Sequence, residues 1–246
     1  MSRKKLPIGI QTFREIREDN CYYVDKTAFA LRMIKEGKAY FLSRPRRFGK
    51  SLFLDTLAEL FAGNEPLFRG LYCHDKWDWN TKYPVIRISF AGGIMASRAN
   101  LDARIHRILA ENERHFGVAK DEGDIPDRFI SLIQAAEARF GQRAVILVDE
   151  YDKPILDNLT SPDIAREMRD GLRNLYSVIK DQDAHIKFAL LTGVSKFSKV
   201  NIFSGLNNLA DITLSPDFSN ICGYTDADVD TVFAPELTGL DRDEIR

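Results

Sequence analysis

The sequence has few cysteines and no strong charge imbalance, and both absences narrow the class of protein. Its three cysteines, Cys21, Cys73 and Cys222, are far apart and odd in number, so they form neither a disulfide framework nor a zinc-binding pattern. Such cysteines suit a reducing cytosol, and we expect a cytoplasmic protein. The formal net charge of −1 gives no overall attraction to nucleic acid or to an anionic membrane.

Long apolar runs and histidine clusters are also missing. No stretch approaches the length of a transmembrane helix, and residues 1–7 lack the apolar centre of a signal peptide. The four histidines stand in no ligand spacing, so they predict no structural metal site. What remains is an ordinary composition, 44% hydrophobic and 29% charged over 246 residues, which is enough to bury one large core.

The most informative stretch is Arg44-Pro-Arg-Arg-Phe-Gly-Lys-Ser51, which lies between an apolar run at residues 39–42 and a helical run at residues 52–62. Gly-Lys-Ser between a strand and a helix is typical of a phosphate-binding loop. Glycine lets the backbone approach an anion at the helix N-terminus, the lysine reaches the β- and γ-phosphates, and the serine hydroxyl binds the Mg²⁺ of the triphosphate. The residues predicted to bind the nucleotide are Arg46, Arg47, Phe48, Gly49, Lys50, Ser51 and Leu52.

One feature of this loop departs from the usual pattern. Arg44 stands where such loops carry another glycine, and Pro45 removes one N–H group from the anion cradle. The entry to the loop must therefore differ from the usual one. The alternative interpretation is a surface turn with Lys50 as a solvated charge, and the flanking strand and helix argue against it.

A second acidic motif follows the apolar run at residues 144–148, which is typical of a buried parallel strand. We expect Asp149 to hold Mg²⁺ opposite Ser51, and Glu150 to polarise the attacking water as a general base. Acidic residues also follow strands simply because the chain returns to solvent. Asp152 is expected to cap the turn before Pro154 in preference to binding metal.

The remaining candidates are a threonine and several arginines. Thr192 ends the apolar run at residues 187–191, where an ATPase with an inserted strand carries a residue that senses the γ-phosphate. A plain strand end is an equal alternative for Thr192. Arg166, Arg169 and Arg173 share a helix face, and one of them could act as an arginine finger, although a solvated face is the simpler interpretation.

Strands and helices alternate along the chain, which predicts an α/β P-loop NTPase with a mainly parallel sheet flanked by helices. Strands are expected at residues 39–42, 83–90, 144–148, 187–191 and, as an edge strand, 211–214. We expect residues 1–37 to form a lead-in and a helix capped by Asp25, residues 38–215 the ATPase core, and residues 216–246 a small helical C-terminal extension. Because that extension ends inside a helix-like run, a truncated or longer parent protein is expected.

Several separated motifs resemble the AAA-ATPase-like family of predicted prokaryotic P-loop ATPases. They are Tyr22-Tyr-Val-Asp-Lys-Thr27, residues 41–51, Tyr83-Pro-Val85, residues 147–152, Leu191-Thr-Gly193, Ser204-Gly-Leu-Asn-Asn-Leu209 and Ile221-Cys-Gly-Tyr-Thr225. Arg44 in place of glycine is normal in that family. The resemblance implies an ATPase region that members often join to a nuclease-like domain of the PD-(D/E)XK type, whose paired acidic and lysine residues are not seen in this sequence.

The predicted function is Mg²⁺-dependent binding and hydrolysis of ATP by a module that regulates an appended domain or a partner. Activity is expected to be low until a partner or a second copy supplies an arginine. The alternatives are a non-hydrolysing nucleotide switch and, less favoured, a small-molecule phosphotransferase, which would need a lid. We expect a nucleotide as ligand, a homo-oligomer or an appended domain as partner, no membrane, and nucleic acid only by analogy with the family.

Overall fold

The computed structural model describes residues 3–195 and 209–240, which fold around one parallel sheet. Five strands form the sheet in the order β2-β3-β4-β1-β5, and every pairing between them is parallel. The strands are β1 (Ala39–Ser43), β2 (Val85–Ser89), β3 (Ala144–Asp149), β4 (Ile186–Gly193) and β5 (Ala210–Asp211). The expected parallel α/β sheet is therefore confirmed, with β5 at its edge.

The order of the strands separates the two predicted halves of the site by one strand. β4 lies between β1 and β3 and pairs with both, so the strand that precedes the phosphate loop does not touch the strand that ends in Asp149. The register places Ser43 beside Gly193 and Ser89 beside Asp149. All four carboxyl ends consequently lie along one edge of the sheet, where open α/β sheets bind their ligands.

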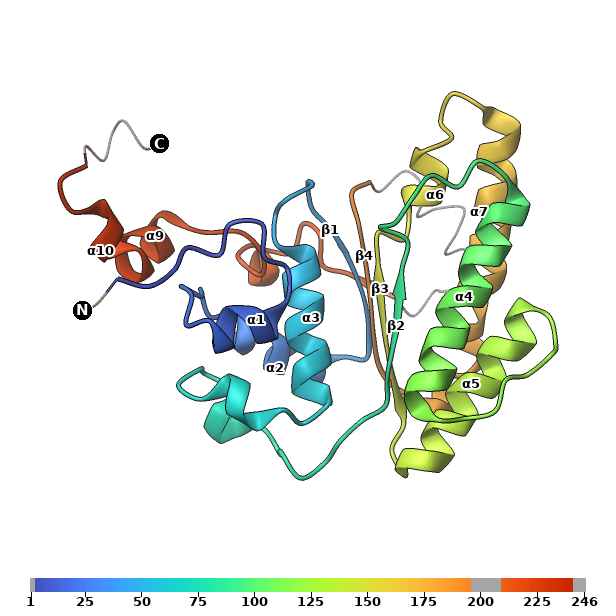
Figure 1. The fold of residues 1–246 in the computed structure, drawn as a ribbon, viewed down its shortest axis with the longest axis horizontal. Helices are drawn as coiled ribbons and strands as arrows, with labels where there is room; N and C mark the ends of the chain where they lie inside the picture. Colours follow the sequence, from blue (N-terminus) through green and yellow to red (C-terminus); the bar gives the residue numbers. More distant parts are fainter. Residues whose placement is uncertain (1–2, 196–208, 241–246) are drawn as a thin grey trace.

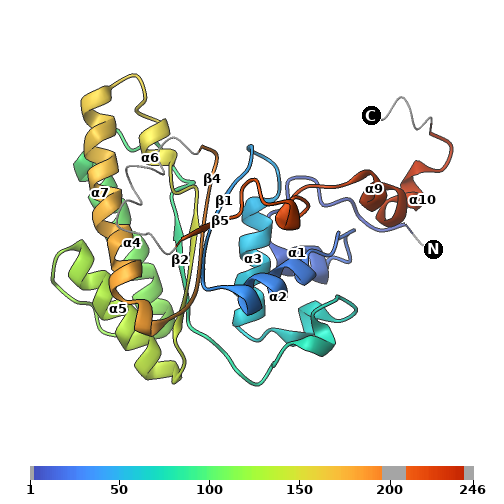
Figure 2. The same cartoon turned by 180° about the vertical axis from the view of Figure 1, so that it is seen from behind.

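Helices cover both faces of the sheet (Figure 1). α1, α2 and α3 lie on one face, and α4, α5 and α7 on the other, and the reverse view in Figure 2 shows the same two layers. The helices are α1 (Phe13–Glu18), α2 (Thr27–Glu36), α3 (Lys50–Phe61), α4 (Arg98–Phe116), α5 (Ile125–Phe140), α6 (Lys153–Leu156), α7 (Pro162–Asp181), α9 (Asp226–Val232) and α10 (Ala234–Leu237).

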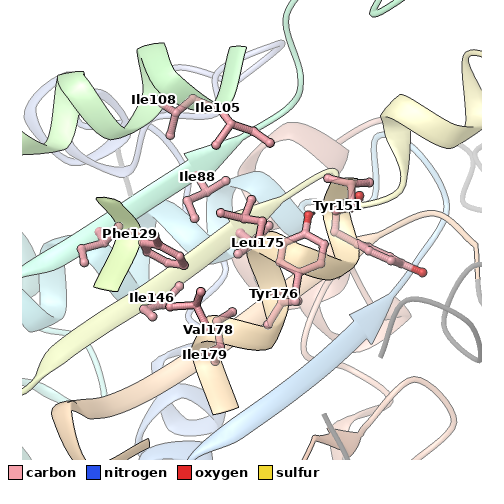
Figure 3. Packing of buried hydrophobic residues seen from close by; sticks show 14 of the residues in the cluster. Ile88, Ile105, Ile108, Phe129, Ile146, Tyr151, Leu175, Tyr176, Val178 and Ile179 are labelled. Carbon is pink, nitrogen blue, oxygen red and sulfur yellow. Dashed lines mark hydrogen bonds between the residues drawn. The ribbon is translucent and has the colours of Figure 1, made fainter. Parts of the chain in front are cut away.

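The strand β3 is apolar up to its last residue because both of its faces are buried. In β3, Ile146 and Val148 pack with the α4, α5 and α7 layer, whereas Val145 and Leu147 pack with the α1, α2 and α3 layer. A strand covered on both sides needs apolar residues at every position, which explains the continuous run in the sequence. Figure 3 shows the first of these clusters, in which Ile146 and Phe129 lie near Ile88.

The segments before and after α3 contain more structure than the sequence indicated. The expected lead-in includes α1, whose Phe13 and Ile16 are buried, and Asp25 lies one residue outside the N-cap position, which Lys26 holds. Asp25 still accepts hydrogen bonds from both the backbone N–H and the hydroxyl of Thr27. Short 3₁₀ turns at Glu65–Phe68 and His74–Lys76 lie in the segment between α3 and β2.

The two tryptophans that follow α3 serve packing in this structure. Trp77 packs edge-on against Phe61 with ring centroids 5.5 Å apart, and Trp79 packs on Phe68 at 5.1 Å. Both phenylalanines belong to the buried cluster on the α3 face. The two indole rings therefore extend the buried aromatic cluster at this end of α3.

The C-terminal residues form two short helices that contact the N-terminal segment. Thr225 and Asp228 make a capping box at the start of α9. Lys26 forms an ion pair with Asp228 at 3.0 Å, and the hydroxyl of Tyr22 donates to Glu236. Within residues 3–195 and 209–240, no helix combines the length and the apolar character that crossing a bilayer requires.

Candidate functional site

The phosphate loop occupies residues 44–49, between the end of β1 and the start of α3. Gly49 has a φ of +86° at the N-cap of α3, in the left-handed region that glycine adopts without strain. Arg47 also has a positive φ, of +63°. Left-handed residues that alternate with right-handed ones turn backbone N–H groups toward a common concave side, which is how anion-binding nests are built.

Lys50 lies inside this loop and does not extend into solvent. Its side-chain Nζ donates to the carbonyl oxygens of Arg44 and Pro45, each at 2.9 Å, and the residue is only 6% exposed. Burial is the main influence on this ammonium and lowers its pKa, while the nearby carboxylate of Asp149 opposes the shift. The loop therefore holds a cation at its centre, close to the carboxylate that ends β3.

Ser51, Asp149 and Thr192 meet in one hydrogen-bonded group. The hydroxyl of Ser51 donates to Oδ2 of Asp149 at 2.6 Å, and the hydroxyl of Thr192 donates to Oδ1 of the same carboxylate at 2.8 Å. The three side chains come from α3, β3 and β4. The structure thus brings together Ser51 and Asp149, which were expected on opposite sides of Mg²⁺, and Thr192, which was expected to sense the γ-phosphate.

Glu150 directly follows Asp149 at the end of β3. Its φ of +52° is unusual for a residue with a side chain. Partial burial is the largest cause of a raised pKa for its carboxyl group, and the charge of Asp149 adds to it; Lys153, Arg46 and Lys50 act in the opposite direction. The carboxyl group of Glu150 is therefore within electrostatic range of cations from the phosphate loop and from α6.

A cavity of about 240 Å³ opens beside Ser51 and Asp149. It lies between α3 and the carboxyl ends of β2 and β3, and the N-terminal segment closes one side. Its polar lining comprises Gln11, Thr12, Ser51, Asp55, Arg87, Ser89 and Asp149. Asp55 is buried, accepts from the backbone N–H of Phe13 at 2.7 Å and forms an ion pair with Arg87 at 2.7 Å. No local sequence pattern selects Asp55, because its two partners lie in distant segments.

The oxygens of Ser51 and Asp149 fit a magnesium ion. Mg²⁺ prefers hard oxygen ligands in octahedral geometry at 2.0–2.1 Å, so two neighbouring ligands lie about 2.9 Å apart. The measured separation of 2.6 Å between the Ser51 hydroxyl and Oδ2 of Asp149 needs only a small adjustment to match this edge. The adjoining cavity leaves room for the waters that Mg²⁺ usually retains.

Arg44 makes side-chain hydrogen bonds that a glycine at this position could not make. Its guanidinium donates to the carbonyl oxygens of Thr213 and Phe218, and the backbone N–H of the preceding Ser43 donates to the hydroxyl of Thr213. The arginine therefore fastens the start of the phosphate loop to the segment that follows β5. This partnership links positions about 170 residues apart, so no local pattern could indicate it.

The far end of the loop contacts the same C-terminal segment. A side-chain carbon added at Gly223 would lie 3.0 Å from the ring of Phe48. The ring can pack against this segment because residue 223 has no side chain. Phe48 is nevertheless 44% exposed, and Arg46 and Arg47 are exposed beside it, while Leu52 is half-buried on the first turn of α3. These residues surround the loop on its open side.

The expected role of Asp152 as a helix cap is wrong. Asp152 occupies the N-cap position of α6, but its side chain makes no capping hydrogen bond there. Its carboxylate instead accepts from the backbone N–H groups of Val194 and Ser195, at 3.1 Å and 2.7 Å. A fully buried aspartate needs such donors, and these lie beyond the end of β4, out of reach of any sequence pattern.

The arginines of α7 lie on a helix surface away from these contacts. Arg166 and Arg169 form ion pairs with Asp163 and Asp170 of the same helix. Their use as arginine fingers, and that of Arg173, stays a prediction. The motif at residues 204–209 lies almost entirely outside the described residues.

Comparison with known proteins identifies the family of this chain. A family model described as Predicted AAA-ATPase, or AAA-ATPase-like, matches residues 7–203. A curated protein of Azotobacter chroococcum mcd 1, described as an uncharacterized protein in the vnfD 5' region, is 67% identical over 247 residues. The match covers 100% of this chain and 48% of that protein, so the chain spans about half the length of the curated relative that it matches.

No solved structure matches the chain. The family match spans β1, the phosphate loop, β3 and the whole of β4 with its Thr192, which are the elements that build the candidate site. The chain therefore belongs to the predicted AAA-ATPase-like family.

Proposed function

We propose that the chain binds ATP together with Mg²⁺ and hydrolyses it, as an ATPase module that regulates an appended domain or a partner. One observation carries the proposal: the Ser51 hydroxyl at the end of the phosphate loop lies 2.6 Å from the carboxylate of Asp149. A cation-binding oxygen pair at this place is what a loop that holds a magnesium triphosphate requires. Membership of the predicted AAA-ATPase-like family supports the same assignment.

The loop would bind the phosphates through its backbone and through one buried charge. The N–H groups of residues 46–51, at the N-terminus of α3, favour an anion through their own dipoles and that of the helix. Lys50 already lies at the centre of the loop, bonded to two loop carbonyls. On binding, its ammonium would exchange these carbonyls for phosphate oxygens with little movement, so the loop is organised before the ligand arrives.

Glu150 and Thr192 would act on the attacking water. Glu150 is partly buried among Lys50, Arg46 and Lys153, and a carboxylate in this place can accept the proton of a water that attacks the γ-phosphate. Thr192, bonded to Asp149 at 2.8 Å, would orient that water from the neighbouring strand. When bound, Mg²⁺ supplies charge neutralisation for the β- and γ-phosphate oxygens.

The regulatory part of the proposal rests on the contacts of the loop with the C-terminal segment. Arg44 binds Thr213 and Phe218 at one end of the loop, and Phe48 packs on Gly223 at the other. A ligand that reshapes the loop must also act on this segment, because the contacts are shared. In a longer protein, that segment would pass the state of the nucleotide site to whatever it is joined to or binds.

Two measurements test this function. Wild-type protein should bind MgATP in a fluorescence titration, and Lys50→Ala should lose that binding. Wild-type protein should also release phosphate from ATP without any added acceptor. Glu150→Gln should then lower turnover by about 100-fold to 10,000-fold, the usual contribution of a general base, while ATP binding is retained.

The same experiment separates the alternatives. Equal and near-zero phosphate release from wild-type protein and Glu150→Gln, with ATP binding intact, would indicate a non-hydrolysing nucleotide switch. Phosphate transfer that depends on an added small molecule would indicate a phosphotransferase. Absence of nucleotide binding by wild-type protein in the presence of Mg²⁺ would refute the proposal altogether.

A further inference from the structure

Glu150 has a backbone conformation that a glutamate does not adopt without support. Its φ is +52°, in the left-handed region that residues with a side chain rarely adopt. Strain of this kind persists only where the surrounding structure enforces it, and it is common at functional sites. The contacts on either side of Glu150 are therefore the parts of the structure that can enforce this conformation.

On its N-terminal side, Glu150 is fixed by the residue that precedes it. Oδ1 of Asp149 accepts the backbone N–H of Glu150 at 3.0 Å and also the hydroxyl of Thr192 at 2.8 Å. The carboxylate of Asp149, which is proposed to hold the metal, thus also links the backbone N–H of Glu150 to Thr192 of β4.

On its C-terminal side, the next two residues bind the chain that leaves β4. The backbone N–H of Tyr151 donates to the carbonyl of Thr192 at 3.0 Å, and the hydroxyl of Tyr151 donates to the carbonyl of Ser195 at 2.9 Å. The buried carboxylate of Asp152 accepts from the N–H groups of Val194 and Ser195. We name these contacts between residues 151–152 and residues 192–195 the β3–β4 clamp.

The clamp has no spare room, because Gly193 is packed directly against both of its side chains. A side-chain carbon at Gly193 would lie 2.3 Å from the ring of Tyr151 and 2.7 Å from Oδ1 of Asp152. The ring of Tyr151 also packs edge-on against Phe41 of β1 at 5.3 Å, and lies in the buried cluster beside Tyr176 of α7 (Figure 3). The clamp is therefore anchored in the rigid core of the sheet.

We propose that Asp152 and Tyr151 are positioning residues of the hydrolytic site: the β3–β4 clamp holds Glu150 in its left-handed conformation, and this conformation sets the place of its carboxylate. Without the clamp, residue 150 would relax to an ordinary conformation and its carboxylate would leave the place of the attacking water. This inference rests on the proposed function, since it assigns a purpose to the placement of Glu150.

The test compares turnover and binding in Asp152→Asn. The amide keeps the shape of the side chain, but it has no charge and one accepting oxygen in place of two, so it binds the N–H groups of Val194 and Ser195 more weakly. We expect kcat to fall by about 10-fold to 100-fold, the size of effect that follows a displacement of about 1 Å of a catalytic group, while the Kd for ATP changes less than about twofold. Tyr151→Phe removes the hydroxyl that donates to Ser195 and should lower kcat by a smaller factor.

A double variant separates positioning from general damage. If Asp152 acts through Glu150, adding Asp152→Asn to Glu150→Gln should leave kcat at the value of Glu150→Gln alone. Ile179→Val, a conservative change in the same core cluster, controls for loss of stability and should leave kcat unchanged. An equal fold-change of kcat in both backgrounds, or a parallel loss of ATP affinity, would overturn the inference.

Crystal structures of the wild type and of Asp152→Asn test the clamp independently of any activity. We expect the φ of residue 150 to be positive in the wild type and negative in the variant, and a positive φ in both would overturn the inference. Should wild-type protein bind ATP without releasing phosphate, hydrolysis itself would be refuted, and the crystal structures would still decide whether the clamp sets the conformation of Glu150.

Discussion

The hydroxyl of Ser51 donates to the carboxylate of Asp149 over 2.6 Å, although the two residues are 98 positions apart in the chain. β4 lies between the strands that lead to them, so the contact spans three strands at the carboxyl edge of the sheet. It joins the first turn of α3 to the end of β3 and creates the oxygen pair on which the proposed magnesium site depends.

The first prediction concerns that metal site. We expect chelation of Mg²⁺ with EDTA to weaken ATP binding to the wild type by about tenfold or more, equivalent to at least 1.4 kcal/mol. Asp149→Ala removes one of the two oxygens, and its ATP binding should respond little to EDTA. Titration of a fluorescent ATP analogue with and without EDTA measures both. Glu65→Ala, which changes a carboxylate on the far side of α3 at a 3₁₀ turn, is the control and should behave like the wild type.

Much of the site could be anticipated because its residues follow directly from regular elements. The phosphate loop ends β1 and starts α3, and the acidic pair ends β3, so a strand and a helix in the right order were enough to place them. The period of the apolar residues also distinguished doubly buried strands from amphipathic helices. Thr192 could be selected for the same reason, as the last side chain of a buried strand.

The residues that escaped prediction depend on partners far away in the chain. Asp152 is a buried anion that needs N–H donors from beyond β4, and Arg44 reaches carbonyls after β5. Neither partner is visible in a local pattern. α1 was missed for another reason: at six residues it is too short to show helical periodicity, and its stability comes from burying Phe13 and Ile16.

The second prediction concerns Arg44. Arg44→Ala should lower the free energy of unfolding by about 1–2 kcal/mol, because hydrogen bonds from a charged group to the carbonyls of Thr213 and Phe218 are lost. It should also expose the segment after β5 to proteolysis. Urea denaturation and limited trypsin digestion measure the two effects. Arg46→Ala, on the exposed part of the same loop, should change the free energy of unfolding by less than about 0.5 kcal/mol.

The third prediction concerns the thiol of Cys222, which lies beside the phosphate loop. Burial raises its pKa from 9.0 to about 11, although Arg44 and Lys50 act in the opposite direction. Since the thiolate is the reactive form, alkylation by iodoacetamide at pH 8 should be much slower than for an exposed cysteine. Mass spectrometry of native protein and of protein unfolded in urea measures the difference, and equal rates would contradict it.

The same pKa shift predicts how stability depends on pH. Between pH 9 and about 11, the thiol of Cys222 keeps its proton in the folded protein and loses it in the unfolded protein. The unfolded state then binds fewer protons, so the free energy of unfolding should fall as the pH rises through this range. Cys222→Ala should show a smaller fall in urea denaturation at pH 8, 9 and 10.

The fourth prediction concerns a buried ion pair between α4 and α5. Both oxygens of Glu113 accept from Arg128 at 2.7 Å, and the two side chains are only 4% and 3% exposed. Hydrogen bonding to Glu113 is the main cause that raises the pKa of Arg128, so the arginine stays charged. Glu113→Leu leaves that charge buried without its partner, which should lower the free energy of unfolding by about 3–5 kcal/mol.

Removing both charges should restore most of this loss. In Glu113→Leu with Arg128→Met, no uncompensated charge remains and apolar side chains of similar size fill the space, so we expect stability within about 1 kcal/mol of the wild type or above it. His106, whose Nδ1 lies 3.0 Å from Arg128, is partly exposed and can bond to water instead. Urea denaturation of the single and double variants measures the coupling. A double variant as unstable as Glu113→Leu would show that the pair contributes through geometry that apolar residues cannot replace.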